Sequence, residues 1–234
     1  EGALTVHLGD GIDPAINRRV TALQGAIGSA GLRGITDLIP AYADLTVCYD
    51  CTVISAKALQ RQLRRLLDSL SVAGQDRRRV FRLPVCYGGD YGPDLDFVCH
   101  HSGLSAQEVI ALHSAPDYLI YMLGFLPGFA YLGGLDPRLH TPRLDSPRTC
   151  IPAGSVGIGG AQTGVYPLAS PGGWQLLGRT PVSVFDRQRQ EPILYRAGDL
   201  VHFVPISPAE YEKIARAVAA GTYTVQVEEV PVCD

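Results

Sequence analysis

The chain has 234 residues, of which 46% are hydrophobic and 18% are charged, and its formal net charge at pH 7 is −3. This composition is typical of a compact globular protein and excludes a chain that is disordered over most of its length. A slightly acidic chain with no apolar run near the roughly 20 residues of a membrane span is expected to bind neither nucleic acid nor membrane.

The first predicted elements are a strand and a helix. Residues 3–8 alternate in polarity as a half-buried strand does. Asp13 is expected to cap a helix that carries Pro14 in its first turn and ends at Gly28 and Gly31. Apolar residues of this helix fall on one face, and they are Ile16, Val20, Leu23 and Ile27.

The next predicted elements complete a small domain. Strands are expected over residues 32–39 and 45–49, then a helix from Ser55 and a further strand over 80–85. The helix carries a stripe of leucines: Leu59, Leu63, Leu66, Leu67 and Leu70. The resulting β-α-β-β-α-β order predicts a split βαβ, or ferredoxin-like, domain.

A cluster of turn residues marks the predicted junction between two domains. It reads Tyr-Gly-Gly-Asp-Tyr-Gly-Pro at residues 87–93. Because turn residues of this kind interrupt regular structure, the predicted domains are residues 1–86 and residues 87–234.

The second domain is predicted to be a small closed barrel with a few helices. Asp94 is expected to cap a short helix, and the Ser105-x-x-Glu108 capping box starts a helix that ends near His113. A second capping box begins at Ser207. Short strands are expected at residues 118–123, 151–158, 174–177, 182–185, 193–195, 200–204 and 223–227. The two domains together indicate an α+β protein.

Residues 124–179 differ in composition from the rest of the chain. They hold twelve of its 26 glycines, its single Trp and four Arg, but neither Lys nor Glu. Glycine lets backbone approach backbone, or a ligand, closely, and proline fixes the geometry between such points. Two interpretations stay open: a Gly/Pro-rich barrel with tight corners, or a ligand site.

Polar side chains near this segment suit a pocket for a small polar molecule. Gln, Thr and Tyr orient an amide or a carboxylate through hydrogen bonds rather than attack it. The backbone N–H groups of Gly172 and Gly173 are candidates for an anion-binding nest. The candidate substrate-binding residues are His113, Phe125, Pro127, Gly128, Ser155, Gln162, Thr163, Tyr166, Ser170, Gly172 and Trp174.

Three Pro-Arg pairs recur every five residues in the same segment, and their arginines are Arg138, Arg143 and Arg148. Proline favours an extended backbone, which displays these side chains. Together with Arg179 they are candidates to bind phosphate or carboxylate. The alternative is that they brace neighbouring loops by donating to backbone carbonyls.

Several motifs of catalysis and cofactor binding are missing from the sequence, including the GxxxxGK[ST] phosphate loop, HExxH and GxSxG. Cys48-x-x-Cys51 is a single pair in a strand-like run, and His100-His101 has no obvious carboxylate ligand nearby. Neither a metal nor a tightly bound cofactor is therefore predicted, and no residue is assigned as catalytic.

Several longer motifs occur in order along almost the whole chain, at residues 84–89, 112–114, 124–139, 152–158, 162–167 and 170–181. The longest reads Gly-Phe-Leu-Pro-Gly-Phe-Ala-Tyr-Leu-Gly-Gly-Leu-Asp-Pro-Arg-Leu. These motifs resemble those of the family of 5-oxoprolinase B subunits (PxpB). That family includes the histidine-kinase inhibitor KipI and was long labelled allophanate hydrolase subunit 1.

The resemblance implies a cyclophilin-like β-barrel after the N-terminal α+β domain, and a cytoplasmic protein. It implies two partners, which are the related barrel protein known as the C subunit of 5-oxoprolinase and the A subunit of the same enzyme. With them, the complex opens the lactam of 5-oxo-L-proline to L-glutamate with ATP as co-substrate. The isolated chain is expected to be inactive.

On this resemblance, the B and C subunits are expected to activate the lactam by phosphorylating its carbonyl oxygen, and the A subunit to hydrolyse the activated ring. Gln162, Thr163 and Tyr166 would orient the substrate, while the four arginines would offset phosphate or carboxylate charge. Three alternatives stay open: a KipI-like inhibitor of sensor histidine kinase autophosphorylation, a carboxyltransferase-like protein for urea or another amide, and a prolyl isomerase.

Overall fold

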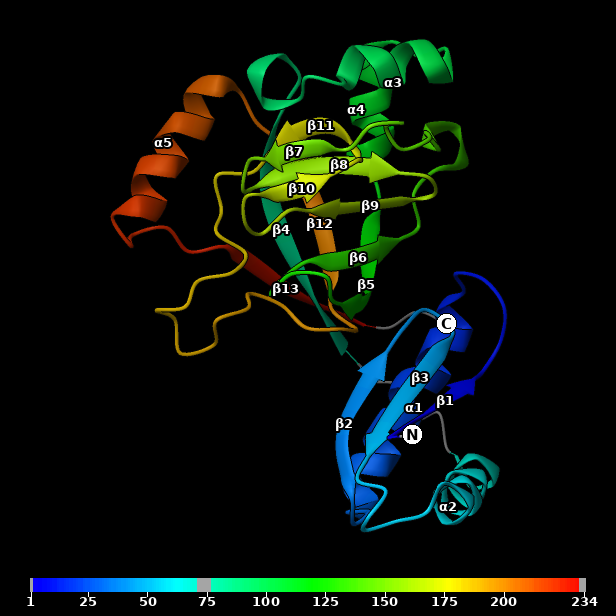
Figure 1. The fold of residues 1–234 in the computed structure, drawn as a ribbon. Coiled ribbons are helices and arrows are strands. Elements are labelled where there is room, and N and C mark those ends of the chain that lie inside the picture. Colours follow the sequence, from blue (N-terminus) through cyan, green and yellow to red (C-terminus); the bar gives the residue numbers. More distant parts are fainter. Residues whose placement is uncertain (1, 71–76, 232–234) are drawn as a thin grey trace. The chain divides into compact units, whose positions relative to one another are not determined.

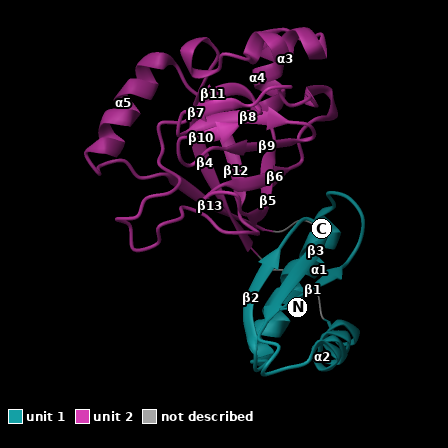
Figure 2. Ribbon diagram, viewed as in Figure 1, with its two compact units in different colours: residues 1–76, 234 teal, residues 77–233 magenta. Residues whose placement is uncertain are grey.

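The computed structural model describes residues 2–70 and 77–231 (Figure 1). The chain divides into two compact units, residues 1–76 and residues 77–233 (Figure 2). The predicted α+β class is confirmed, because a small N-terminal βαβ sheet precedes a seven-stranded mixed β-barrel. Within the described ranges, no helix is long and apolar enough to cross a membrane.

The N-terminal unit is a three-stranded antiparallel sheet packed against two helices. Its elements are β1 (Ala3–His7), α1 (Pro14–Ala30), β2 (Ile35–Pro40), β3 (Asp44–Tyr49) and α2 (Ala56–Asp68). The strands lie in the order β1-β3-β2. Alternate residues of β3, Leu45 and Val47, are fully buried against leucines of both helices, which include Leu23, Leu59 and Leu63.

Capping groups start both helices of this unit and end the first helix as predicted, whereas the second helix ends at Asp68, before Leu70 of the predicted stripe. Asp13 Oδ1 accepts a hydrogen bond from the backbone N–H of Ala15 at 2.6 Å. The helix ends at Gly31, whose left-handed φ of 56° suits glycine. Ser55 accepts from the N–H of Ala58 at the start of α2. These local contacts explain why the helix boundaries could be predicted from the sequence.

The strand predicted over residues 80–85 belongs to the barrel and not to the N-terminal sheet. It forms β4 (Arg77–Tyr87), which pairs in parallel with β12 (Leu200–Pro205) and antiparallel with β13 (Gln226–Pro231). Its side chains Phe81 and Leu83 complete the barrel core. The boundary expected after residue 86 therefore lies at the far end of β4, and the N-terminal sheet has three strands.

Seven strands close the barrel in the order β11-β8-β9-β6-β5-β12-β4, with β4 pairing back to β11. Their remaining bounds are β5 (Asp117–Leu123), β6 (Ala130–Gly133), β8 (Ser155–Gly159), β9 (Gln162–Val165) and β11 (Gln175–Arg179). Strand β13 extends the sheet along β4, and β7 (Arg148–Ile151) pairs with β10 (Ser170–Gly172) in a separate two-stranded sheet.

Among the residues that the structure describes, three α-helices accompany the barrel: α3 (Leu95–Ser102), α4 (Ala106–Ser114) and α5 (Pro208–Ala219). Both predicted capping boxes are confirmed, with the Ser105 and Ser207 side chains accepting from the N–H groups of Glu108 and Glu210. Short 3₁₀ turns occupy Gly89–Tyr91 and Pro137–Leu139. Helix α4 packs beside β12, so its last turn delivers a histidine into the barrel.

Several predicted strands differ from the structure. The run 151–158 is divided into β7 and β8 by a turn at Gly154, where φ is 82°. Residues 182–185 and 193–195 contribute one isolated bridge, between Phe185 and Ile193. Strands β6, β9 and β10 were not predicted, because each is short and rich in glycine or proline.

Candidate functional site

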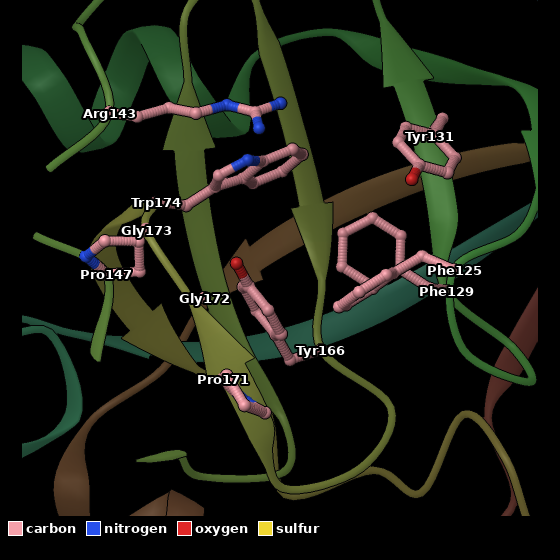
Figure 3. A pocket seen from close by; sticks show the side chains of 10 residues that line it. All are labelled: Phe125, Phe129, Tyr131, Arg143, Pro147, Tyr166, Pro171, Gly172, Gly173 and Trp174. Carbon is pink, nitrogen blue, oxygen red and sulfur yellow. The ribbon is translucent and has the colours of Figure 1, made fainter. Parts of the chain in front are cut away.

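An open pocket of about 320 Å³ lies in the barrel unit, within the glycine-rich segment (Figure 3). Loop residues after β5 and before β7, with Tyr131 of β6, form part of its wall. Tyr166 after β9, β10 and the residues that follow β10 form the rest. The lining residues are Phe125, Phe129, Tyr131, Arg143, Pro147, Tyr166, Pro171, Gly172, Gly173 and Trp174.

Buried aromatic rings give this pocket a rigid wall. Phe129 meets Tyr166 edge to face, with ring centroids 5.2 Å apart and planes at 82°. It meets Trp174 in the same way, at 5.5 Å and 76°. All three side chains are buried. Edge-to-face pairs of this kind fix ring orientation, so the wall is formed before a ligand arrives.

Glycines let these rings pack against the backbone. A Cβ at Gly164 would lie 3.1 Å from Trp174 Cζ3, and one at Gly159 would overlap the indole ring. At Gly172, a Cβ would lie 2.6 Å from Tyr166 Oη and 2.7 Å from a methyl group of Ile151. The glycines of this segment therefore allow close packing in the barrel and in the pocket wall alike. The two interpretations left open by the sequence, a tightly packed barrel and a ligand site, are compatible with each other.

Phe125 stands at the entrance with a strained backbone. Its φ is 64°, in the left-handed region that bulky residues avoid, and its side chain is 65% exposed. The ring packs edge to face on Phe129 at 5.7 Å. A tight turn holds the loop, in which Gly124 N–H donates to the Phe129 carbonyl at 3.1 Å. Such strain in an exposed aromatic residue is typical of functional loops.

Arg143 carries the free positive charge of the pocket. Its guanidinium carbon lies 5.8 Å from the centroid of the Trp174 ring, a cation–π contact (Figure 3). It forms neither an ion pair nor a hydrogen bond with any residue that the structure describes. An exposed guanidinium held on one face by an indole ring keeps its donors available for an anion.

Tyr166 contributes a hydroxyl group to the pocket, and Figure 3 shows it pointing toward Trp174. Burial raises the pKa of this phenol above its usual value, while a backbone hydrogen bond from Trp174 and the charge of Arg143 partly oppose the rise. The group is therefore protonated at neutral pH and can donate a hydrogen bond to a ligand oxygen.

Arg138 is neutralised by a neighbour in its own turn. Its Nε and Nη2 donate to the two carboxylate oxygens of Asp136 at 3.0 and 2.7 Å. These hydrogen bonds, with the Arg138 backbone N–H, lower the pKa of Asp136 to about 2. Both side chains lie outside the pocket lining.

Arg148 and Arg179 brace the backbone around the pocket. Arg148 donates to Asp94 at 2.6 Å and to the Trp174 carbonyl at 3.3 Å. Arg179 donates through Nε to the Ala153 carbonyl at 2.9 Å. Both arginines donate to a backbone carbonyl, as the bracing alternative expects, and Arg148 also forms an ion pair with Asp94.

His113 lies fully buried inside the barrel, away from the pocket lining. Thr163 Oγ1 donates to the Gly157 carbonyl at 3.0 Å, so it accepts from His113 Nε2 at 2.8 Å. His113 Nδ1 then accepts from the Tyr87 hydroxyl at 2.8 Å. Burial lowers the pKa of His113 to about 3, which keeps the ring neutral. The ring stacks on Phe203 at 4.8 Å.

The structure brings together some of the predicted site residues and separates others. Five of them line the pocket, together with Gly173 of the expected nest: Phe125, Arg143, Tyr166, Gly172 and Trp174. The others lie outside its lining: His113, Pro127, Gly128, Ser155, Gln162, Thr163, Ser170, Arg138, Arg148 and Arg179. Among these, Pro127 and Gly128 border a shallower hollow beside Phe125, and Ser155 and Ser170 are buried.

Four lining residues were not predicted from the sequence: Phe129, Tyr131, Pro147 and Pro171. Phe129 and Tyr131 are two positions apart, so they project to the same side of the chain as it enters β6. Their ring centroids are 5.1 Å apart. This alternation could have identified Phe129 and Tyr131 from the sequence. No local sequence pattern indicates that Pro147 and Pro171 line the same pocket.

Comparisons with known proteins extend over most of the chain. The family model described as carboxyltransferase domain, subdomain C and D, matches residues 1–195. The 5-oxoprolinase B subunit of Bacillus subtilis is 42% identical over 221 residues, covering 90% of this chain and 92% of that protein. The corresponding protein of Escherichia coli O157:H7 is 45% identical over 206 residues, covering 88% and 93%.

A solved structure also has the same fold. The urea amidolyase of K. lactis matches 98% of this chain and 16% of its own with a TM-score of 0.84 and 23% sequence identity. At this identity, the likeness concerns the arrangement of the elements alone.

Proposed function

The chain belongs to the family of 5-oxoprolinase B subunits, and from this premise we propose that its aromatic pocket holds the lactam substrate of an ATP-dependent 5-oxoprolinase. Family membership rests on 42–45% identity over nearly the full length of the relatives. The observation that carries the proposed site is the unpaired Arg143 beside a wall of buried aromatic rings.

The chemistry of 5-oxoproline fits this arrangement. The molecule is a flat five-membered lactam with one carboxylate, so it needs an apolar slot and one cation. Arg143 supplies a fork of N–H donors for the carboxylate. Trp174 and Phe129 supply flat walls for the ring, and the protonated Tyr166 hydroxyl donates to the lactam oxygen. The chain's role is therefore to orient the lactam.

The same residues fit a triphosphate poorly. Of the four arginines of the segment, Arg138 and Arg148 are each paired with a carboxylate, and Arg179 is used by a backbone carbonyl. One remaining guanidinium matches one carboxylate, whereas nucleotide sites use several cationic groups and a phosphate-binding loop. We therefore assign the lactam to this chain and ATP to the partner proteins.

Within the assembled complex, the pocket prepares the lactam for activation. A carboxylate clamped by Arg143 fixes the ring in one orientation, and the Tyr166 hydroxyl polarises the carbonyl as charge develops on its oxygen. The A and C subunits are proposed to supply the remaining groups of the reaction. The groups that carry out the reaction thus lie on different chains, which explains why the isolated chain is expected to be inactive.

The deciding experiment measures 5-oxoproline-dependent ATP hydrolysis by this chain, alone and mixed with the A and C subunits. We expect turnover in the full mixture and none from the chain alone. Arg143→Ala tests the pocket in the same mixture, and Arg138→Ala is the matched control. No turnover in a mixture that demonstrably assembles would overturn the assignment of substrate.

A second candidate substrate is another amide, such as urea. The description of the matching family model, a carboxyltransferase domain, supports this alternative. Urea lacks a carboxylate, so Arg143 would have no partner in it. Replacing 5-oxoproline by urea in the assembled mixture separates the two: turnover with urea that is unaffected by Arg143→Ala would favour the second candidate.

A further inference from the structure

Strand β1 is an open edge of the N-terminal sheet. The sheet has the order β1-β3-β2, so β1 pairs on one side with β3 and has no neighbour on its other side among the described residues. In a complete β-α-β-β-α-β unit, a fourth strand lies beside the first. The strand at that place in the sequence, β4, belongs to the barrel instead.

The open edge presents a row of backbone hydrogen-bonding groups. Tyr49 N–H donates to the Gly2 carbonyl at 2.7 Å and Leu8 N–H donates to the Ala43 carbonyl at 2.9 Å, so the even-numbered residues of this run face β3. In an antiparallel pair the intervening residues direct their N–H and C=O groups the other way. Three residues therefore present these groups to the open side: Ala3, Thr5 and His7.

A groove of about 180 Å³ lies between β1 and α2, next to this edge. Its apolar lining comes from Leu4 and Val6 on β1 and from Leu63 and Leu67 on α2. Leu4, Val6 and Leu67 are only partly buried by the core that they join. A strand added to the edge would place every second side chain over this groove and complete that burial.

The opposite edge of the sheet is protected, and β1 is not. Strand β2 ends in Pro40, carries the exposed Asp37, and has an irregular register beside it. Proline, charge and bulges on an edge strand prevent a further strand from pairing. The β1 sequence Ala-Leu-Thr-Val-His contains no proline, lysine or carboxylate, so nothing in it opposes pairing.

One cation, Arg64, lines the groove. Its side chain is exposed and forms no ion pair with another residue in the described part of the chain. Because only every second side chain of an added strand would face the groove, a segment with carboxylates among those side chains would complement Arg64.

We propose that the β1 edge and the β1–α2 groove form a docking site for an extended acidic segment of a partner protein, which pairs antiparallel with β1 as a fourth strand. Strand addition of this kind uses main-chain hydrogen bonds for affinity and alternate side chains for specificity. A second copy of the chain fits less well. If β1 paired with β1 of a second copy, the α2 helices of both copies would lie beside the same edge. Each helix is about 10 Å wide, whereas adjacent strands are only about 4.8 Å apart, so the two helices would compete for the same space.

The test uses the full chain labelled with ¹⁵N and a synthetic ten-residue valine–glutamate peptide, in which valine and glutamate alternate on the face toward the groove and threonine occupies the other face. We expect the peptide to slow amide hydrogen exchange at Ala3, Thr5 and His7 and to shift the resonances of Leu63 and Leu67. The same peptide with lysine in place of glutamate is expected to bind about tenfold more weakly, because its charges face Arg64.

Two variants separate docking from folding. Thr5→Pro removes an outward N–H and the hydroxyl bond to Thr46 but none of the backbone hydrogen bonds between β1 and β3, and prolines are tolerated at such edge positions. Thr5→Val removes the same hydroxyl bond to Thr46 but keeps the N–H. We expect binding by Thr5→Val and loss of binding, with an intact spectrum, in Thr5→Pro.

Three kinds of result would overturn the proposal. The first is no binding of the valine–glutamate peptide, or equal binding by Thr5→Pro. The second is protection of Ala3, Thr5 and His7 amides in the free chain at every concentration, which would mean that the chain covers its own edge. The third is protection that rises with protein concentration, which would assign the edge to a second copy.

Discussion

Arg143 and Arg138 occupy equivalent places in the Pro-Arg repeat but differ in what surrounds their charge. Arg138 is paired at two points with Asp136, whereas Arg143 lies against the Trp174 ring with no carboxylate partner in the described structure. The repeat in the sequence indicated three displayed cations. Which of these arginines keeps its donors free for a ligand depends on neighbouring residues, and the five-residue spacing of the repeat does not specify those neighbours.

Arg143→Ala is expected to weaken 5-oxoproline binding by the assembled enzyme. Losing a hydrogen bond to a charged group costs about 1.5–3 kcal/mol, which corresponds to a rise in KM of about 10- to 150-fold. Stability should stay within about 0.5 kcal/mol, since Arg143 is exposed. The measurement is steady-state kinetics with urea denaturation alongside. Arg138→Ala, the control, should leave KM unchanged, and an equal effect of both would contradict the assignment.

The burial of His113 predicts how the stability of the protein depends on pH. Its pKa falls from 6.5 to about 3 on folding because the ring is buried, so only the unfolded chain binds a proton between these values. The free energy of unfolding should therefore be fully retained above about pH 6.5 and fall by about 1.4 kcal/mol per pH unit below it. Urea denaturation at several pH values between 4 and 8 checks this slope.

His113→Gln provides the comparison. Glutamine keeps one acceptor for the Tyr87 hydroxyl and one donor for Thr163, but it does not titrate. Carboxylates elsewhere contribute equally to both proteins, so the difference between the two slopes isolates His113. Parallel pH profiles would show that the histidine is already accessible to protons in the folded state.

At the scale of single elements, the loop between β5 and β6 stores strain in Phe125. Phe125→Gly relieves the left-handed φ of 64°, whereas Phe125→Ala keeps the strain and also removes the ring. We expect the glycine variant to be more stable than the alanine variant by about 1 kcal/mol. Both should raise KM, because both lose the aromatic entrance. Thermal unfolding compares them, and an alanine variant of equal or greater stability would show that the backbone is not strained.

Arg148 ties the start of α3 to β11. It donates to Asp94, whose other oxygen accepts from the Leu176 N–H at 2.6 Å. Because Asp94 is buried, Arg148→Ala leaves its charge poorly compensated and should cost about 2 kcal/mol of stability. The double variant Arg148→Ala with Asp94→Asn should recover part of this loss. A single variant as stable as the parent in urea denaturation would contradict the role.

Local elements and long-range pairing differ in how far the sequence determined them. The starts of the helices could be predicted from N-capping residues such as Asp13, Ser105 and Ser207, because their hydrogen-bond partners lie within three residues in the sequence. The placement of β4 in the barrel could not be predicted in this way, because its neighbours β12 and β13 lie more than a hundred residues away in the sequence. The same limit applies to the pocket. The sequence indicates that aromatic residues close together in the chain share one side, whereas Arg143 and Trp174 come into contact only through the tertiary structure.

At the scale of the whole molecule, the chain has separate hydrophobic cores in its two units. The N-terminal core gathers Leu45 and Val47 with leucines of α1 and α2, and the barrel core gathers β4, β5 and β12 around Phe203. No residue belongs to both of these clusters in the described structure. The two units are therefore expected to unfold as two cooperative transitions.

The single tryptophan makes this expectation testable. Trp174 lies in the barrel unit, so its fluorescence reports on that unit, whereas far-ultraviolet circular dichroism reports on both. Leu45→Ala removes a fully buried side chain from the N-terminal core and should destabilise that unit by about 2–5 kcal/mol. In urea, we expect the dichroism curve to gain an early transition while the fluorescence midpoint stays constant. Because a shared core would transmit the loss to both probes, an equal shift of the fluorescence midpoint would show that the two units unfold as one.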